Sequence, residues 1–158
     1  MKYPNFREEN KLKKKGFKSI AGIDEAGRGP LASSVVAAAV IIGEGISFSK
    51  LKNSKDLSSS LREEIFKEAK RDPRIKWGIG RVSEKVIDRI NILEATKLAM
   101  KRAVVNLKED ADFLIIDGNI EIDLDIPQKS VIKGDEKVFS CALASVVAKV
   151  TRDRAMAR

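Results

Sequence analysis

The sequence contains no histidine and a single cysteine, and both shortages restrict the chemistry it can perform. Without histidine, the chain cannot contain a Ser-His or Cys-His catalytic pair, a His-ligated zinc ion or a histidine general base. The lone Cys141 cannot form a disulfide within the chain, which fits a reducing compartment and leads us to expect a cytoplasmic protein. Any catalysis must therefore come from carboxylates, lysine, hydroxyl groups or a metal ion held by carboxylates.

Long hydrophobic runs are also missing. The longest, residues 31–42, spans twelve residues and includes two serines, so it is too short to cross a bilayer. The chain opens with polar and charged residues, without the apolar stretch that follows the basic start of a secretion signal. We therefore expect no membrane partner.

The length and the charge set two further bounds. A chain of 158 residues suits one domain, which would bury about 70% of its unfolded surface without disulfides or a structural metal. The 31 Lys and Arg exceed the 23 Asp and Glu, for a net charge of +8. This balance favours polyanions, with nucleic acid ahead of an anionic membrane face. Charge alone leaves the question open, because many cytosolic proteins of this size are basic without such a partner.

Apolar periodicity and turn residues predict five strands and several helices. We expect helices at 58–71, 83–90, 92–107 and 138–156, and strands at 19–24, 35–42, 75–82, 113–116 and 130–132. The first three strands should form a meander, and the last two need longer connections. The predicted fold class is α/β, a mixed five-stranded sheet flanked by helices. The lysine-rich residues 2–18 are expected to form a solvated helix end or arm.

Acidic residues stand where predicted strands end. Asp24 and Glu25 end the first strand, Asp117 ends the fourth, and Asp135 precedes the last helix. Ligands of open α/β sheets collect just beyond strand ends. Asp24 and Glu25 can share one site only if the chain bends there, since consecutive strand residues face opposite sides. Taken locally, a tight turn with a solvated acidic pair is the alternative.

Carboxylates gathered in one place must either take up protons or bind a cation. Oxygen ligands without histidine or a cysteine cluster favour Mg²⁺ or Mn²⁺. Such ions commonly serve phosphoryl transfer, and a pair about 4 Å apart stabilises both the attacking and the leaving oxygen. A basic chain with an acidic metal pocket therefore indicates a nuclease or another phosphoryl-transfer enzyme. A structural ion or a non-catalytic acidic cluster is the alternative.

Five segments resemble, in order, the motifs of the ribonuclease HII (type 2 ribonuclease H) family. The first is Ile-Asp-Glu-Ala-Gly-Arg-Gly-Pro-Leu-Ala at 23–32, and the second is Ser-Lys-Asp-Leu at 54–57. The others are Ile-Asn-Ile-Leu at 90–93, Ile-Asp-Gly-Asn at 116–119, and Gly-Asp at 134–135 followed by residues 144–154. Each segment is weak alone, but five in order are a specific signal.

The resemblance implies a ribonuclease H-like fold and a metal-dependent endoribonuclease. It would hydrolyse the RNA strand of RNA–DNA hybrids and incise DNA duplexes on the 5′ side of an embedded ribonucleotide. The family's catalytic, metal-binding acids fall on Asp24, Glu25, Asp117 and Asp135, which would hold two Mg²⁺ or Mn²⁺ ions. The implied partner is a hybrid or a ribonucleotide-containing DNA duplex, bound by a monomer.

The resemblance also implies substrate-binding residues. The turn formed by Gly27, Arg28 and Gly29 would sense the ribose 2′-hydroxyl, the group that distinguishes RNA from DNA. Lys55, with Ser54 beside it, would approach a backbone phosphate. A solvated loop lysine is the alternative for Lys55.

Two features depart from the family pattern. Ser33-Ser34 stands where the family usually has Gly-Pro. The family's chains also continue beyond the last helix into a segment with a tyrosine that packs at the deoxyribose beside the ribonucleotide. The only tyrosine here is Tyr3, outside the motifs. We therefore expect one ribonuclease H-like catalytic domain over residues 1–158, without that C-terminal segment. A truncated, weakly active or inactive hybrid-binding domain is the alternative, and a different nuclease of the same fold is a third possibility.

Overall fold

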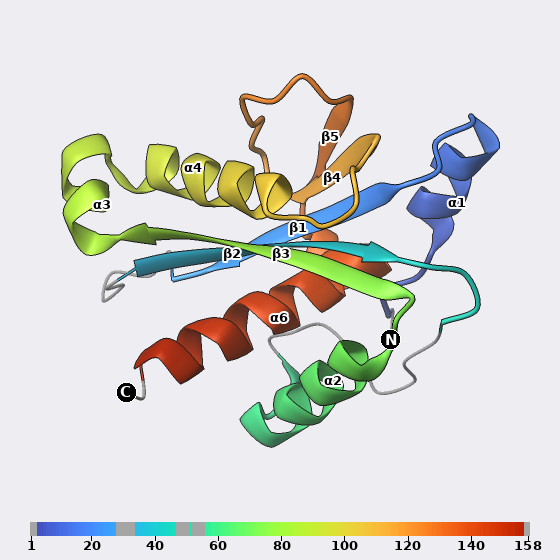
Figure 1. The fold of residues 1–158 in the computed structure, drawn as a ribbon, viewed down its shortest axis with the longest axis horizontal. Helices are drawn as coiled ribbons and strands as arrows, with labels where there is room; N and C mark the ends of the chain where they lie inside the picture. The colour runs from blue at the N-terminus through green and yellow to red at the C-terminus, as the bar shows by residue number, and fades with distance from the viewer. Residues whose placement is uncertain (1–2, 28–33, 47–50, 52–55, 157–158) are drawn as a thin grey trace.

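A computed structural model describes residues 3–27, 34–46, 51 and 56–156 of the chain (Figure 1). Its centre is a five-stranded sheet in the order β3-β2-β1-β4-β5. The strands are β1 (Ile20–Ala26), β2 (Ser34–Ile42), β3 (Ile75–Ser83), β4 (Phe113–Asp117) and β5 (Gln128–Val131). β1, β2 and β3 pair antiparallel, whereas β4 runs parallel to both β1 and β5. The sheet is therefore mixed, and the predicted meander of the first three strands is confirmed.

The strand sequences explain the order of the sheet. β2 reads Ser-Val-Val-Ala-Ala-Ala-Val-Ile-Ile, and its seven interior residues are buried on both faces, as expected of a central strand. β3, at the edge of the sheet, alternates more exposed and more buried residues. β4 is short and buried up to its last residue, Asp117. Because β1 and β4 are parallel neighbours, their carboxyl ends lie side by side near the middle of the sheet.

Helices cover both faces of the sheet (Figure 1). They are α1 (Arg7–Lys14), α2 (Ser59–Arg71), α3 (Glu84–Ile90), α4 (Ile92–Val105), α5 (Gly134–Lys137) and α6 (Phe139–Met156). On one face, α4 packs Ala99 and Met100 into a core with Ala37 and Ala39 of β2. On the other face, α6 and α2 pack against the intervening β2 residues, including Val40. The core is thus two apolar layers separated by the sheet.

Serine side chains cap the start of two helices. The Ser58 hydroxyl accepts a hydrogen bond from the Leu61 N–H at the start of α2, at 3.1 Å. Ser83 caps α3 in the same way through Val86. Among the described residues, no helix is long and apolar enough to span a membrane.

Three elements differ most from the sequence prediction, and β1 also runs to Ala26, beyond its predicted end at residue 24. The lysine-rich N-terminal segment forms the helix α1, and Glu9 and Leu12 on it are buried. The last helix is preceded by the separate short helix α5, which follows a left-handed Lys133. β5 occupies 128–131 rather than 130–132, because it extends a parallel ladder with β4. The burial of α1 and the position of β5 depend on contacts with distant parts of the chain.

Candidate metal centre

Three carboxylates from three elements meet at the carboxyl ends of the central parallel strands. Asp24 lies near the end of β1, Asp117 ends β4, and Asp135 lies in α5. One oxygen of each lies within 4.8 Å of the others. The parallel register pairs Ile23 with Ile116, so the acid that follows each of these residues comes to the same edge. The predicted gathering of these three acids is present in the fold.

Backbone groups orient two of these carboxylates. The Glu25 N–H donates to Asp24 Oδ1 at 2.8 Å, and the Gly134 N–H donates to Asp117 Oδ1 at 2.8 Å. Beyond Asp117 the chain turns at Gly118, whose φ of 114° suits glycine, and Gly118 N–H bonds to Val131 of β5. The hydrogen bond from Gly134 links Asp117 directly to the helix that carries Asp135. The site is therefore held by a hydrogen bond from the α5 backbone to the Asp117 carboxylate and by the backbone bond from Gly118 to β5.

Glu25 lies beside this three-carboxylate cluster but is not a member of it. β1 keeps its pairing with β2 through Ala26, so the chain does not break between Asp24 and Glu25. Glu25 is half-buried, and its charge still acts on Asp24. The structure thus brings together three of the four predicted acids and places the fourth at their edge.

Burial and mutual repulsion shape the protonation of the cluster. Asp24 is only 5% exposed, and burial raises its pKa well above the ordinary value. The negative charges of Glu25 and Asp117 raise the same pKa further. Burial also raises the pKa of Asp117; the hydrogen bond with Asp24 opposes that rise, and the charge of Asp135 adds to it. Ionisation of the whole cluster therefore requires a compensating positive charge.

The donor set fits a hard divalent cation. All the available ligand atoms are carboxylate oxygens, the type that Mg²⁺ and Mn²⁺ prefer. A bound cation would replace the protons that the cluster otherwise retains and would relieve its repulsion. The residues present are thus suited to a divalent metal ion.

Gly27 follows the strand that carries Asp24, with a φ of 101°. A Cβ there would lie 2.3 Å from the Ser34 carbonyl oxygen and 2.7 Å from Arg152 Nε, so the turn has room for glycine alone. Arg152 Nε also donates to the Ser34 oxygen at 3.3 Å, a contact that no sequence spacing signals. The remaining predicted substrate residues lie outside the described part of the chain: Arg28, Gly29, Ser54 and Lys55.

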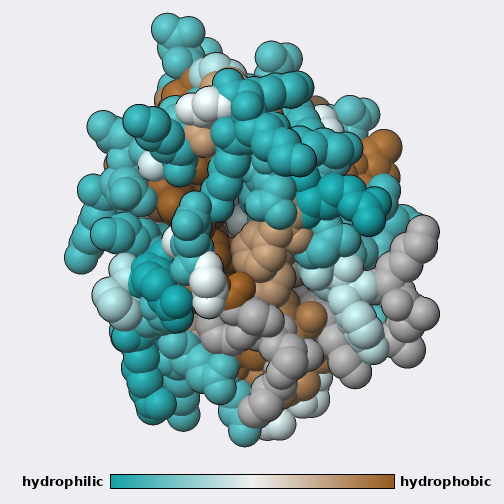
Figure 2. All heavy atoms as spheres, turned by 90° about the vertical axis from the view of Figure 1, so that its right-hand side faces the viewer, coloured by the Kyte–Doolittle hydropathy of each residue, from teal (hydrophilic) through white to brown (hydrophobic). Residues whose placement is uncertain are grey.

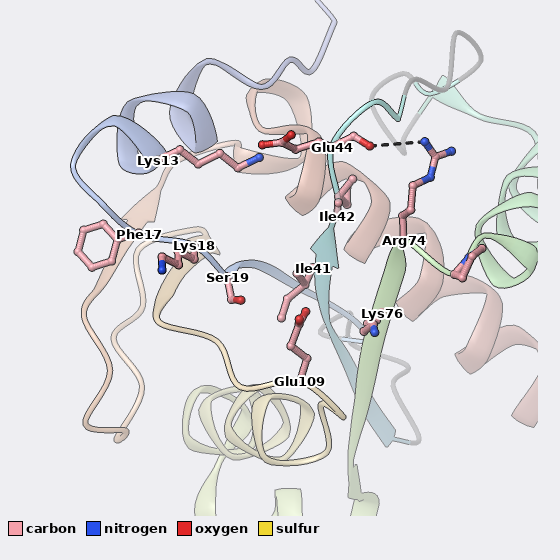
Figure 3. A pocket seen from close by; sticks show the side chains of 12 residues that line it. Lys13, Phe17, Lys18, Ser19, Ile41, Ile42, Glu44, Arg74, Lys76 and Glu109 are labelled. Atoms are coloured by element: carbon pink, nitrogen blue, oxygen red, sulfur yellow. Dashed lines mark hydrogen bonds between the residues drawn. The ribbon is translucent and has the colours of Figure 1, made fainter.

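A hollow of about 490 Å³ lies elsewhere, at the opposite end of β1 next to Ser19 (Figure 3). Lys13, Lys18 and Lys76 line it, but so do two glutamates, one of them Glu109. Arg74 in its wall already pairs with an aspartate two residues earlier. Because its charges are mixed and it is remote from the acids, this hollow is not the candidate site. The face at this end of the molecule is mostly hydrophilic (Figure 2).

Comparisons with known proteins agree with the geometry. The family model of ribonuclease HII matches residues 21–158. Ribonuclease HII from Syntrophotalea carbinolica is 47% identical over 148 residues, which cover 94% of this chain and 70% of that protein. Ribonuclease HII from Acetivibrio thermocellus is 53% identical over 146 residues, covering 92% of this chain and 57% of the relative. This chain therefore spans only part of the length of each relative.

A solved structure shares the fold. It is the PCNA:RNase HII complex from Archaeoglobus fulgidus, with a TM-score of 0.74 at 29% identity, covering 89% of this chain and 76% of that one. The mixed sheet with helices on both faces is thus the predicted ribonuclease H-like fold. By sequence and by architecture, the chain belongs to the ribonuclease HII family, whose members are metal-dependent endonucleases.

Proposed function

We propose that this chain is an endoribonuclease that hydrolyses the RNA strand of RNA–DNA hybrids and incises DNA duplexes 5′ of embedded ribonucleotides. The observation that supports this function is the cluster of Asp24, Asp117 and Asp135, three carboxylates within 4.8 Å in a ribonuclease HII fold. The chain as a whole carries a net charge of +8, which favours binding of a nucleic acid although the site itself is acidic.

Asp24, Asp117 and Asp135, with Glu25 at their edge, would hold two Mg²⁺ or Mn²⁺ ions. Bound there, the ions would supply Lewis-acid stabilisation of the attacking and leaving oxygens at phosphorus. The chain contributes the orientation of its ligands, because the N–H groups of Glu25 and Gly134 fix the Asp24 and Asp117 carboxylates. Burial of Asp24 removes water from around its carboxylate, which strengthens its attraction for a cation.

Recognition of RNA is assigned to the turn after β1. Gly27, Arg28 and Gly29 would read the 2′-hydroxyl, since that group separates ribose from deoxyribose. The positive φ of Gly27 brings the backbone close to Ser34 and leaves no room for a side chain. Ser54 and Lys55 would contact a phosphate of the backbone. We expect the protein to act as a cytoplasmic monomer.

A substrate panel tests this proposal. The chain is incubated with an RNA–DNA hybrid, a DNA duplex with one ribonucleotide and an all-DNA duplex, in Mg²⁺, in Mn²⁺ or in EDTA. We expect cleavage of the first two duplexes only, on the 5′ side of the ribonucleotide in the second, and none in EDTA. Binding without cleavage in either metal would instead favour a non-catalytic hybrid-binding domain. Cleavage of the all-DNA duplex would favour a different nuclease.

A further inference from the structure

The first turn of α6 contacts both strands that carry the acids. Gly22, two residues before Asp24, packs so closely on it that a Cβ would lie 2.3 Å from Ser140 Oγ. Cys141 Sγ donates to the carbonyl oxygen of Ile115, two residues before Asp117, at 3.4 Å. The short helix α5, with Asp135, leads directly into this turn. A shift of the first turn of α6 would therefore change the spacing of all three carboxylates.

The N-terminal segment contacts the junction between α5 and α6, at residues 137–140. The Phe139 N–H donates to the Asn5 carbonyl oxygen at 2.9 Å, and the Asn5 N–H donates to the Lys137 carbonyl oxygen at 3.2 Å. The Phe6 ring stacks on the Phe139 ring with their centroids 4.4 Å apart. These contacts attach α1 to the backbone between α5 and α6.

Glu9 of α1 reaches furthest into the junction. Its side chain is 4% exposed, and Oε2 accepts a hydrogen bond from the Ser140 N–H at 3.0 Å. The first N–H groups of a helix have no partner within the helix, so this carboxylate satisfies one of them from outside. Burial raises the pKa of Glu9 more than the bonds from Ser140 lower it.

A buried carboxylate is a poor choice for stability alone, because a well-packed apolar side chain would avoid its desolvation. A hydrogen bond with a fixed direction does, however, set where a helix begins. We propose that Glu9 is a positioning residue, which holds the first turn of α6 so that Asp24, Asp117 and Asp135 keep the spacing needed to bind divalent ions. This inference rests on the proposed function. Residue 9 lies outside the segment matched by the family model, which begins at residue 21.

Three variants separate positioning from general stabilisation. Glu9→Ala removes the acceptor, Glu9→Gln keeps an acceptor oxygen of similar shape, and Asn10→Ala changes an exposed neighbour on the same helix. We expect Glu9→Ala to weaken Mn²⁺ binding, measured by calorimetry, by about tenfold, as for other residues behind metal ligands. Glu9→Gln and Asn10→Ala should bind Mn²⁺ like the parent chain. If Glu9→Ala does not fold, Glu9→Met, which fills the space without an acceptor, replaces it.

Hydrogen exchange provides a readout that does not depend on metal binding. In Glu9→Ala, exchange should become faster at residues 134–142, which include Asp135, while β3 at the sheet edge stays as protected as in the parent. Unchanged exchange at 134–142 in Glu9→Ala, or Mn²⁺ affinity equal to that of the parent, would overturn the positioning role. A parent chain that neither binds Mn²⁺ nor cleaves would refute the proposed function instead, and the exchange data would still decide whether Glu9 holds the turn.

Discussion

Replacing Asp24 by asparagine should stabilise the metal-free protein while abolishing the metal site. Burial, followed by the charges of Glu25 and Asp117, holds the pKa of Asp24 well above its ordinary value. The folded state therefore keeps a proton that the unfolded chain loses near pH 3.9. Stability falls as the pH rises from the unfolded to the folded pKa of Asp24, and the ionised form remains penalised above that window. Asparagine removes this penalty and retains Oδ1 as the acceptor for the Glu25 N–H.

Linkage gives the direction of the change in stability, and the usual range for stabilising substitutions gives its size. Each unit by which the folded pKa exceeds the unfolded one corresponds to about 1.4 kcal/mol. Single stabilising substitutions commonly contribute about 0.5–2 kcal/mol. For a chain of this length, 1 kcal/mol moves Tm by about 2–4 °C. We therefore expect Asp24→Asn to raise Tm by about 1–8 °C at pH 7.

The assay is thermal unfolding in EDTA and again in Mg²⁺ or Mn²⁺. Asp125→Asn is the matched control, because Asp125 is exposed and its change removes the same charge. Divalent ions should raise the Tm of the parent and the control but not of Asp24→Asn, because only ligands that bind the folded state stabilise it. An Asp24→Asn variant that unfolds at or below the parent Tm in EDTA would show that burial and repulsion at Asp24 do not destabilise the folded protein.

Two further predictions concern the scaffold. Gly22→Ala places a methyl group 2.4 Å from the Ser140 carbonyl carbon, so α6 must move by about 1 Å to make room. Urea unfolding should show that the free energy of unfolding falls by about 1–3 kcal/mol. An unchanged urea midpoint would contradict the close packing of Gly22 on α6. Glu63→Ala breaks the surface ion pair with Arg154, whose Nη2 lies 2.6 Å from Glu63 Oε2. Both side chains are over a third exposed, so the free energy of unfolding should fall by less than about 1 kcal/mol in the same assay. A larger fall would show that solvent does not screen the pair.

The sheet could be predicted because the apolar residues within each strand indicate a strand without reference to the rest of the chain. β2 and β4 are short apolar runs typical of strands buried on both faces, and the turn residues after them mark their ends. The meeting of Asp24 and Asp117 follows from the rule that parallel strands end at one edge. The bend that Asp24 and Glu25 would need in order to share one site is absent, since β1 pairs with β2 through Ala26. The alternation of side chains between the two faces of a strand therefore did not predict that the charge of Glu25 would still raise the pKa of Asp24.

The role of α1 could not be predicted. Its sequence is dominated by charge, which predicts a solvated arm. Of its two buried residues, Glu9 and Leu12, only Leu12 is apolar, so the short helix has no repeating apolar pattern. The contact between Glu9 and Ser140 joins residues at opposite ends of the sequence, so only the folded structure reveals it. Helix α5 was missed for a related reason, because Lys133 adopts a left-handed conformation that non-glycine residues rarely take.

The proposed function requires the carboxylate cluster to bind the divalent ions used in cleaving RNA. A decisive experiment compares Asp117→Asn with Asp125→Asn, which removes one charge from an exposed site, on a DNA duplex containing one ribonucleotide in Mg²⁺ or Mn²⁺. We predict that Asp117→Asn lowers the incision rate by more than about a hundredfold, since even residues behind a metal ligand are worth about 10–100-fold, while Asp125→Asn incises at the parent rate. Incision at the full rate by Asp117→Asn would show that the cluster is not the catalytic metal site.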